Sequence, residues 1–153
     1  LLTTSNRSEG DVGYCTMDGD TSGSIAPIAG VSKHFVKNWL LWAQSTLGYH
    51  GLDIVNQLQP TAELRPQAAH QTDESDLMPY EILLKIEEKA IRDRLSPLQV
   101  FNALKETIDP SALQKYIIKF FTLWSRNQWK RERLAPSFHV DDFNVDPRSW
   151  CRF

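Results

Sequence analysis

The sequence predicts a mostly α-helical chain with about four helices and one N-terminal strand. Apolar residues recur at three- and four-residue spacing in several stretches between residues 35 and 124, as on one face of a helix. Serine, aspartate or proline stands where these stretches begin, as at helix N-termini. Two polar segments, 5–31 and 58–79, contain five of the seven glycines and four of the eight prolines and are predicted to be loops.

The N-terminal third is predicted to contain a strand end, a long loop and one helix. Residues 1–4 are expected to end a buried strand, because two leucines precede two β-branched threonines. Ser32 is predicted to cap a helix that runs to about Leu47 and stops at Gly48. The apolar side chains of this helix either join the core or form an interface, and they are Phe35, Val36, Trp39, Leu40, Trp42 and Ala43.

Three further helices are predicted in the rest of the chain. One spans 79–94 and opens at a proline-tyrosine pair. The sequence SPLQ at 96–99 is a capping box with proline at the first helical position, and it opens a short helix to Lys105. Residues 135–153 have no periodicity and are predicted to be a tail that must dock on something. The last helix opens at Asp109, and its predicted buried residues are Leu113, Tyr116, Ile117, Phe120, Phe121 and Trp124.

The composition suits one soluble domain with one core, since 41% of the 153 residues are apolar and 24% are charged. A net charge of −2 gives no electrostatic reason to expect nucleic acid or a membrane. No apolar run approaches the roughly 20 residues that a membrane span needs. Cys15 and Cys151 have neither zinc-site nor disulfide-framework spacing, so a reducing cytoplasm is expected. A lone strand has no sheet to join, so we expect further chain upstream.

Residues around the first predicted loop suit a ligand that carries phosphate. Thr4 follows the predicted strand, where α/β folds bind ligands, and could donate its hydroxyl. Glu9 could bind a hard cation such as magnesium, although an ordinary exposed acid is the simpler interpretation. Lys33 stands at the start of a helix, where backbone amides and the helix dipole favour an anion. A solvated surface lysine is an equal alternative for Lys33.

The second loop contains acids that could bind a metal, but a solvated acidic face is the favoured interpretation. Residues 18–20 are predicted to be a plain turn. The histidines have no pairing at ligand spacing, and no known catalytic motif is present, so no catalytic residue is nominated. The polar residues of interest in the second loop are Thr61, Asp73, Glu74 and Asp76.

Four segments follow one another in the order TTSNRSEGDVGYCTMDGDTSGSIAPIAGVSK, PTAELRP, QTDESDLMPY and RNQWKRERLAP. Together they resemble NAD synthetase, and TSNRSE and MDGDTSG are more similar to the bacterial glutamine-dependent form than to the short ammonia-dependent form. The resemblance implies that residues 1–134 are the C-terminal portion of an α/β Rossmann-like ATP pyrophosphatase domain, of the adenine nucleotide alpha hydrolase-like kind. Residues 135–153 would be a C-terminal tail. The SGGxDS half of the domain and a nitrilase-like glutaminase domain, both absent from this sequence, would lie upstream.

The resemblance implies a cytoplasmic ligase that forms NAD from deamido-NAD, ATP and ammonia derived from glutamine. In that family ATP, with Mg²⁺, adenylates the nicotinate carboxylate, and ammonia then displaces AMP. Family members assemble as dimers or larger oligomers through this domain, so a homo-oligomer is expected. Because the pyrophosphate-binding signature SGGxDS is absent from these 153 residues, the chain alone is expected to be inactive.

The resemblance also implies contacts to ATP. Thr4 would contact the adenosine part of ATP, and Lys33 and Thr61 would lie by its phosphates. Asp73 would make a further contact to ATP. Segment 61–79 would become ordered over the bound nucleotide.

For deamido-NAD the resemblance implies a second set of contacts. Glu9 would contact deamido-NAD or magnesium, and Lys130 would contact the dinucleotide. The short ammonia-dependent enzymes have a lysine in place of Met17 and an aspartate in place of Ser24, so those two contacts are not carried over. The stretch that would line the deamido-NAD site consists of Tyr14, Cys15, Thr16 and Met17.

Two other functions are alternatives. The chain could be a non-catalytic helical interaction module, but the retention of Thr4, Lys33 and Thr61 argues against the decay of a nucleotide site. The basic residues between 126 and 133 could bind single-stranded nucleic acid beside Trp129. An acidic residue interrupts that run, and the net charge of −2 is unfavourable for such binding, so neither nucleic acid nor membrane is expected as a partner.

Overall fold

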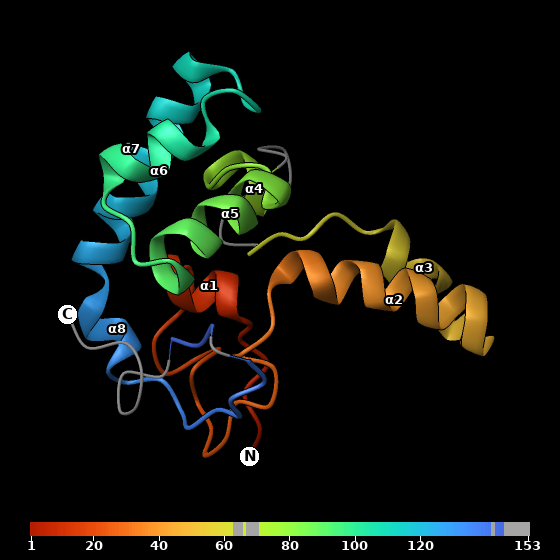
Figure 1. The fold of residues 1–153 in the computed structure, drawn as a ribbon. Coiled ribbons are helices and arrows are strands. Elements are labelled where there is room, and N and C mark those ends of the chain that lie inside the picture. Colours follow the sequence, from red (N-terminus) through yellow and green to blue (C-terminus); the bar gives the residue numbers. More distant parts are fainter. Residues whose placement is uncertain (63–65, 67–70, 142, 146–153) are drawn as a thin grey trace.

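A computed structural model describes residues 1–62, 66, 71–141 and 143–145, and these residues fold mainly into helices (Figure 1). A 3-10 turn, η1 (His50–Leu52), precedes the third helix, and a π-helical turn, η3 (Glu88–Arg92), extends the fifth. The α-helices in chain order are α1 (Arg7–Val12), α2 (Lys33–Leu47), α3 (Asp53–Gln57), α4 (Asp73–Asp76), α5 (Tyr80–Glu87), α6 (Pro97–Leu104), α7 (Pro110–Arg126) and α8 (Gln128–Arg131).

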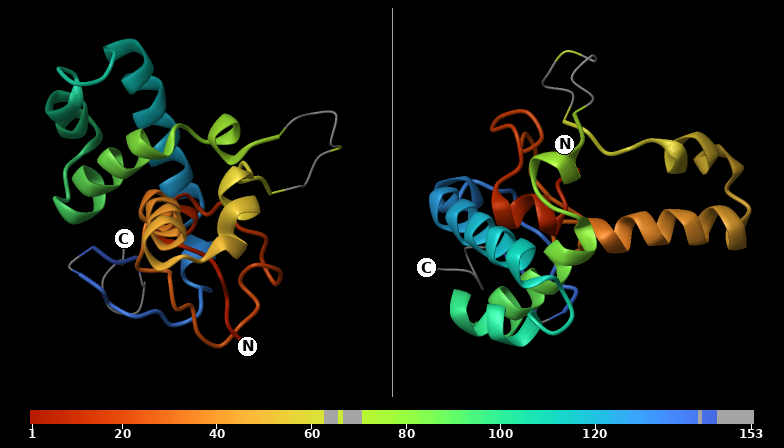
Figure 2. Two further views of the ribbon diagram at one scale, coloured as in Figure 1. Left: turned by 90° about the vertical axis from the view of Figure 1, so that its right-hand side faces the viewer. Right: turned by 90° about the horizontal axis from the view of Figure 1, so that it is seen from above.

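The helices form a packed group and a projecting arm. Helices α5, α6 and α7 pack together with α1 against them, whereas α2 and α3 extend away from this group in Figure 1 and in the right-hand view of Figure 2. We call α2, η1 and α3 the arm. Within the described part of the chain, no helix has the length and apolar character that crossing a bilayer requires.

The hydrophobic core lies among α5, η3, α6 and α7. The predicted apolar stripe of α7 is confirmed at its centre, because Leu113, Ile117 and Phe120 are buried. Phe121 and Trp124 flank Phe120 at ring-centroid distances of 5.4 and 6.0 Å and lie at the edge of the core, where they are only partly buried. The expected core of the C-terminal helices therefore forms within this chain.

The predicted helix starts are confirmed by their caps. The hydroxyl of Ser32 and the carboxylate of Asp109 each accept a hydrogen bond from the amide three residues further on, at 3.2 and 2.9 Å. Ser96 and Gln99 form the expected capping box, with proline at the first helical position. The helix predicted over 79–94 forms as α5 continued by η3.

The apolar face of α2 does not enter the core of this chain, so the core alternative for that face is wrong. Phe35, Trp39 and Trp42 are 57%, 44% and 48% exposed, and Ala43 is the one fully buried residue that α2 contributes. The helix itself is as predicted, because Gly48 ends it in the left-handed conformation with φ of 71°. Sequence periodicity indicates an apolar face but not what covers it, and only the beginning of α2 contacts the packed helices.

The buried strand predicted at residues 1–4 is not confirmed. No strand forms among the described residues, and Leu2 makes only an isolated parallel bridge with Ile25. Leu1 and Leu2 are 86% and 63% exposed. A single bridge gives these leucines no neighbouring strand against which to be buried.

Helix α1 lies in a region that was expected to be all loop. Asn6 and Glu9 form a reciprocal capping box, in which each side chain accepts from the other residue's amide at 3.1 and 3.2 Å. Gly13 ends the helix in the left-handed conformation with φ of 65°. Both signals are present in the sequence, but six residues are too few to display a helical period.

The described part of the C-terminal tail docks beside the N-terminal loop, as its lack of periodicity suggested. The amide of Ala26 donates to the carbonyl of Pro136 at 2.8 Å. Phe143 and Val145 are 4% and 2% exposed, and both belong to the core cluster. The remainder of the tail, including Cys151, lies outside the described residues.

A buried charged network fixes α1 between α5 and α8. Arg7 and Asp11 of α1, Glu87 of α5 and Arg131 of α8 are all buried. Arg7 Nε lies 3.8 Å from Glu87 Oε2, and Arg131 Nη1 donates to the carbonyl of Asp11 at 2.7 Å. Breaking such a buried pair is strongly destabilising, because it leaves an uncompensated buried charge.

Asp11 and Glu87 form a buried acid pair that favours a shared proton. Burial raises the pKa of Asp11 well above its ordinary value, and the neighbouring Glu87 raises the pKa further. Burial also raises the pKa of Glu87, although a hydrogen bond with Ser8 and the charge of Arg7 oppose that shift. As two carboxylates, Asp11 and Glu87 could not hydrogen-bond to each other, whereas a proton on Asp11 lets the two groups form a hydrogen bond.

We predict that Asp11→Asn makes the variant increasingly stable relative to the wild type as pH rises. A raised pKa in the folded state gives stability that is complete below the unfolded pKa and is lost as pH rises through the folded pKa. Asparagine keeps a donor for Glu87 and does not ionise. The check is the free energy of unfolding from urea denaturation between about pH 4 and about pH 9.

Asp109→Asn is the control of opposite sign. Hydrogen bonds from Ala112 and Ser111 lower the pKa of Asp109, so its stability is present above the unfolded pKa and is lost as pH falls. In Asp109→Asn, the free energy of unfolding should therefore fall less steeply at acidic pH than in the wild type. If the free energy of unfolding of Asp11→Asn changed with pH as that of the wild type does, Asp11 and Glu87 would not share a proton.

Candidate functional site

A polar cavity of about 470 Å³ opens where the N-terminal loop, α1, the start of α2, residues 60–62 and α4 meet. These segments are far apart in the sequence, and the fold brings them to one place. We call it the polar cavity. The residues assigned by resemblance that line it are Thr4, Glu9, Tyr14, Thr16, Lys33, Thr61 and Asp73.

A smaller cavity of about 170 Å³ adjoins the polar cavity. Cys15 and Lys130 line it, and it shares Tyr14 and Thr16 with the polar cavity. Met17 lines neither of the two cavities. The structure therefore brings together the predicted residues except Met17, in two neighbouring hollows.

Lys33 and Glu9 form an ion pair at the wall of the polar cavity. Lys33 Nζ lies 3.0 Å from Glu9 Oε1, and the two side chains are 21% and 19% exposed. The backbone amide of Lys33, at the first position of α2, donates to the hydroxyl of Ser8 at 3.2 Å. The pair is partly screened by solvent, so it can exchange partners at a modest energetic penalty.

Two tyrosines fix the acidic helix α4 beside the polar cavity. Tyr80 donates to Asp73 Oδ2 at 2.8 Å, and Tyr14 donates to Asp76 Oδ2 at 3.0 Å. Burial and the hydrogen bond with Asp76 raise the pKa of Tyr14 to about 12. Burial and the hydrogen bond with Asp73 raise the pKa of Tyr80, so both phenols remain protonated donors.

Lys130 holds the segment that follows α1. Its ammonium donates to the carbonyls of Gly13 and Cys15 at 3.0 and 2.9 Å. Burial raises the pKa of the Cys15 thiol, while the charge of Lys130 opposes the shift. The structure thus gives Lys130 a role in positioning backbone, and a contact between Lys130 and a dinucleotide stays a prediction.

The basic run between 126 and 133 does not form a row of free cations. Arg131 is buried, with its guanidinium 4.0 Å from the ring centroid of Trp124. Lys130 is held by two carbonyls, and Arg133 lies 3.3 Å from the carboxylate of Asp18. This arrangement argues against the nucleic-acid alternative, since three of the four basic residues of this run, Lys130, Arg131 and Arg133, are committed within the chain.

The described residues do not by themselves form a magnesium site. No group of three or more histidine, cysteine, aspartate or glutamate side chains in the described part of the chain could hold a metal ion. Both oxygens of Glu9 already accept hydrogen bonds, from Lys33 and from the amide of Asn6. We therefore derive no chemical step through a metal, and Glu9 as a metal ligand stays a prediction.

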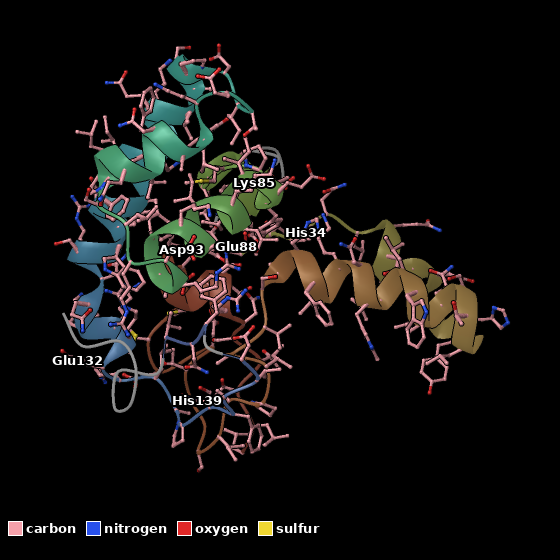
Figure 3. All side chains as sticks on the ribbon, in the orientation of Figure 1. His34, Lys85, Glu88, Asp93, Glu132 and His139 are labelled. Atoms are coloured by element: carbon pink, nitrogen blue, oxygen red, sulfur yellow. The ribbon has the colours of Figure 1, made fainter. Side chains whose placement is uncertain are left out.

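Where the structure describes them, the other residues noted in the sequence do not gather into a group that could hold a metal ion. Residues 18–20 form the expected turn, in which the amide of Gly19 donates to the carbonyl of Thr16 at 3.1 Å. His34 lies at the start of α2 and His139 lies in the tail, well separated in Figure 3. His70 lies outside the described residues.

Sequence reasoning missed several polar residues of the polar cavity and its support. Asn6 and Asp20 line it, and Tyr80 holds Asp73 beside it. The capping pattern formed by Asn6 and Glu9 could have drawn attention to Asn6. No sequence signal indicates Tyr80, because its partner is set by how α4 folds back on α5.

The polar cavity is built mainly from the segments that resemble NAD synthetase in the sequence. The family described as NAD synthase matches residues 1–133, and the chain belongs to it. Its relatives are glutamine-dependent synthetases. It is 34% identical over 153 residues to "Glutamine-dependent NAD(+) synthetase" of Oryza sativa subsp. indica, an alignment that covers 95% of this chain. It is 35% identical over 150 residues to the enzyme of the same name from Aquifex aeolicus, with 97% of this chain covered.

A solved structure has the same fold. The crystal structure of a glutamine-dependent NAD(+) synthetase from Cytophaga hutchinsonii is 57% identical to this chain, covers all of it, and superposes with a TM-score of 0.82. This chain spans 23% of that protein and 21% to 24% of the two sequence relatives. The resemblance seen in the sequence is confirmed.

We predict that Gly13→Ala destabilises the protein by more than Gly48→Ala. Both glycines have positive φ, of 65° and 71°, so alanine is strained by about 1 kcal/mol at either position. A Cβ at Gly13 would lie 2.5 Å from Cβ of Asn127, whereas nothing lies within 4 Å of a Cβ at Gly48. Overpacking should add about 1–3 kcal/mol at Gly13 alone, measured by urea denaturation. Equal losses for the two variants would contradict the close packing of α1 on Asn127.

Proposed function

We propose that this chain is the C-terminal part of the synthetase domain of a glutamine-dependent NAD synthetase. The complete protein would form NAD from deamido-NAD, ATP and ammonia released from glutamine. The observation that carries the proposal is the convergence of seven residues, assigned by resemblance to the two nucleotides, on one polar cavity. They come from four separated parts of the chain, so chance proximity is a poor explanation.

Residues 1–134 would form the C-terminal portion of an ATP pyrophosphatase domain of the Rossmann-like kind, and residues 135–153 would be its tail. The SGGxDS half and the glutaminase domain would lie elsewhere in the complete protein. The 57% identity and TM-score of 0.82 against a glutamine-dependent NAD(+) synthetase support this domain assignment.

The chemistry requires cationic and hydroxyl groups at a phosphate chain. Adenylation transfers AMP from ATP to the nicotinate carboxylate and releases pyrophosphate, and ammonia then displaces AMP. Lys33 would neutralise phosphate charge that develops on the leaving group, with Thr61 beside it and Thr4 at the adenosine. The positive end of the α2 dipole adds to this effect at Lys33.

Magnesium would enter the site together with ATP and would not be bound there beforehand. Magnesium commonly uses one or two carboxylates together with substrate phosphates. Glu9 could become one such ligand only after Lys33 leaves it for the phosphates, because Lys33 now lies 3.0 Å away. Asp73 would contact ATP, and the segment from Tyr14 to Met17, with Lys130, would form the deamido-NAD side.

The complete protein would be a cytoplasmic homo-oligomer that assembles in part through the arm. Exposed apolar side chains on the arm support an interface, because large apolar patches seldom remain exposed to water. The same surface favours the alternative of a non-catalytic interaction module, which would bind a partner without binding nucleotide. The arm contributes Phe35, Trp39, Leu41, Trp42, Leu47, Ile54 and Val55, and Tyr49 and Leu58 adjoin it.

We predict that Lys33→Met lowers kcat/KM for ATP in the complete protein by about 100-fold or more, as for the loss of one preorganised charge donor. The measurement is the rate of NAD formation with deamido-NAD and ammonia at varied ATP. Lys115→Met is the control, because Lys115 is exposed on α7, away from the polar cavity. If Lys33→Met matched the control, Lys33 would have no role at the phosphates.

We also predict that the 153-residue chain alone forms no NAD when ATP, deamido-NAD and ammonia are supplied. The pyrophosphate-binding signature SGGxDS is absent from its sequence, so half of the phosphate site is missing. The complete protein, assayed with the same ammonia, is the positive control. NAD formation by the isolated chain would overturn the assignment of half a site to it.

A further inference from the structure

Helix α4 is four residues long, so it needs support from other elements to hold a defined position. Side chains and an amide from neighbouring segments donate hydrogen bonds to its acidic residues. Tyr14 and Gln71 both donate to Asp76 Oδ2, at 3.0 and 2.7 Å. The position of α4 beside the polar cavity is therefore set by these contacts and not by its own helical stability.

Tyr80 is the most deeply placed of these supports. Tyr80 and Asp73 are 4% and 5% exposed, and the phenol donates to Asp73 Oδ2 at 2.8 Å. The amide of Tyr80 donates to Glu74 Oε1 at 2.8 Å, and Lys37 of α2 lies 5.6 Å above the centroid of the ring. Tyr80 thus connects α4 to α5 and to the arm.

Only one oxygen of the Asp73 carboxylate is used by Tyr80. The other, Oδ1, is buried and has no hydrogen-bond partner among the described residues. A buried carboxylate oxygen without a donor is unfavourable, and a donor brought by a ligand would relieve it. Asp73 lines the polar cavity together with Lys33 and Thr61, so a ligand there can supply that donor.

We propose that Tyr80 is a positioning residue, which fixes one oxygen of Asp73 so that the other accepts a hydrogen bond from a hydroxyl or amino group of the nucleotide. The inference rests on the proposed function in one respect, namely that the nucleotide is ATP. Tyr80 does not touch the nucleotide itself. Its effect on binding passes entirely through the carboxylate of Asp73.

The test compares ATP binding by the complete protein and by Tyr80→Phe, Asp73→Asn and the double variant. Isothermal titration calorimetry with ATP is the readout, since it does not require NAD formation. Tyr80→Phe removes the donor and keeps the ring, and Asp73→Asn can turn an N–H toward the ligand's donor. The matched control is Tyr116→Phe, a partly buried tyrosine of α7 outside both cavities.

We expect each single variant to weaken ATP binding by about tenfold, as for one hydrogen bond to a charged group. The double variant should be no weaker than Asp73→Asn alone, and Tyr116→Phe should bind as the wild type does. Full additivity of the two losses, or wild-type binding by Tyr80→Phe, would overturn the proposal, because Tyr80 would then not act through Asp73. A loosened core would lower the melting temperature without producing this non-additivity.

Analogues of ATP identify the donor. If a ribose hydroxyl is the donor, the loss caused by Asp73→Asn disappears with 2′-deoxy-ATP or 3′-deoxy-ATP. If the adenine amino group is the donor, the loss disappears with the triphosphate of purine riboside. If Asp73→Asn weakened the binding of all three analogues as much as that of ATP, the nucleotide would not donate a hydrogen bond to Asp73. A wild-type protein that binds ATP but forms no NAD would instead overturn the proposed reaction and leave this comparison valid.

Discussion

The guanidinium of Arg7 connects nearly every part of the chain that surrounds α1. It lies 3.8 Å from the buried carboxylate of Glu87 on α5, and it donates to the carbonyls of Gly30 and Phe143 at 3.1 and 3.0 Å. It also stacks 3.6 Å from the ring centroid of Phe143. One side chain therefore ties the packed helices, the N-terminal loop and the tail to a helix of six residues. Isolated helices of that length are not stable in water, so α1 depends on this network.

The polar cavity depends on α1 in turn. Glu9 lies in α1 and holds Lys33, while Gly13 ends α1 and directs Tyr14 toward Asp76. The network around Arg7 is buried, whereas Lys33 and Glu9 are partly solvated. This separation has a physical reason. Charges that only support the fold can be buried permanently, whereas under the proposed function Lys33 and Glu9 have to remain able to change partners.

The sequence predicted best the elements whose cause is local. The caps at Ser32, Ser96 and Asp109 and the core stripe of α7 follow from residues a few positions apart. The partner of the α2 face was not predictable, because periodicity does not say what covers a surface. The N-terminal strand was predicted from β-branched residues, yet strand formation needs a neighbour that the described residues do not supply. Helix α1 was missed because six residues are too few to show a helical period, and its support comes from Glu87 and Arg131, far away in the chain.

The polar cavity shows the same division between local and distant causes. The resemblance assigned Lys33, Thr61 and Asp73 to the nucleotide, and all three line the polar cavity. It could not indicate Tyr80, which does not line the polar cavity but donates a hydrogen bond to Asp73, which does. Nor could the resemblance indicate that the ammonium of Lys130 donates two of its three hydrogen bonds to backbone carbonyls. Residues that hold other residues in place become visible only when distances are known, and in this chain they decide whether the predicted contacts can form.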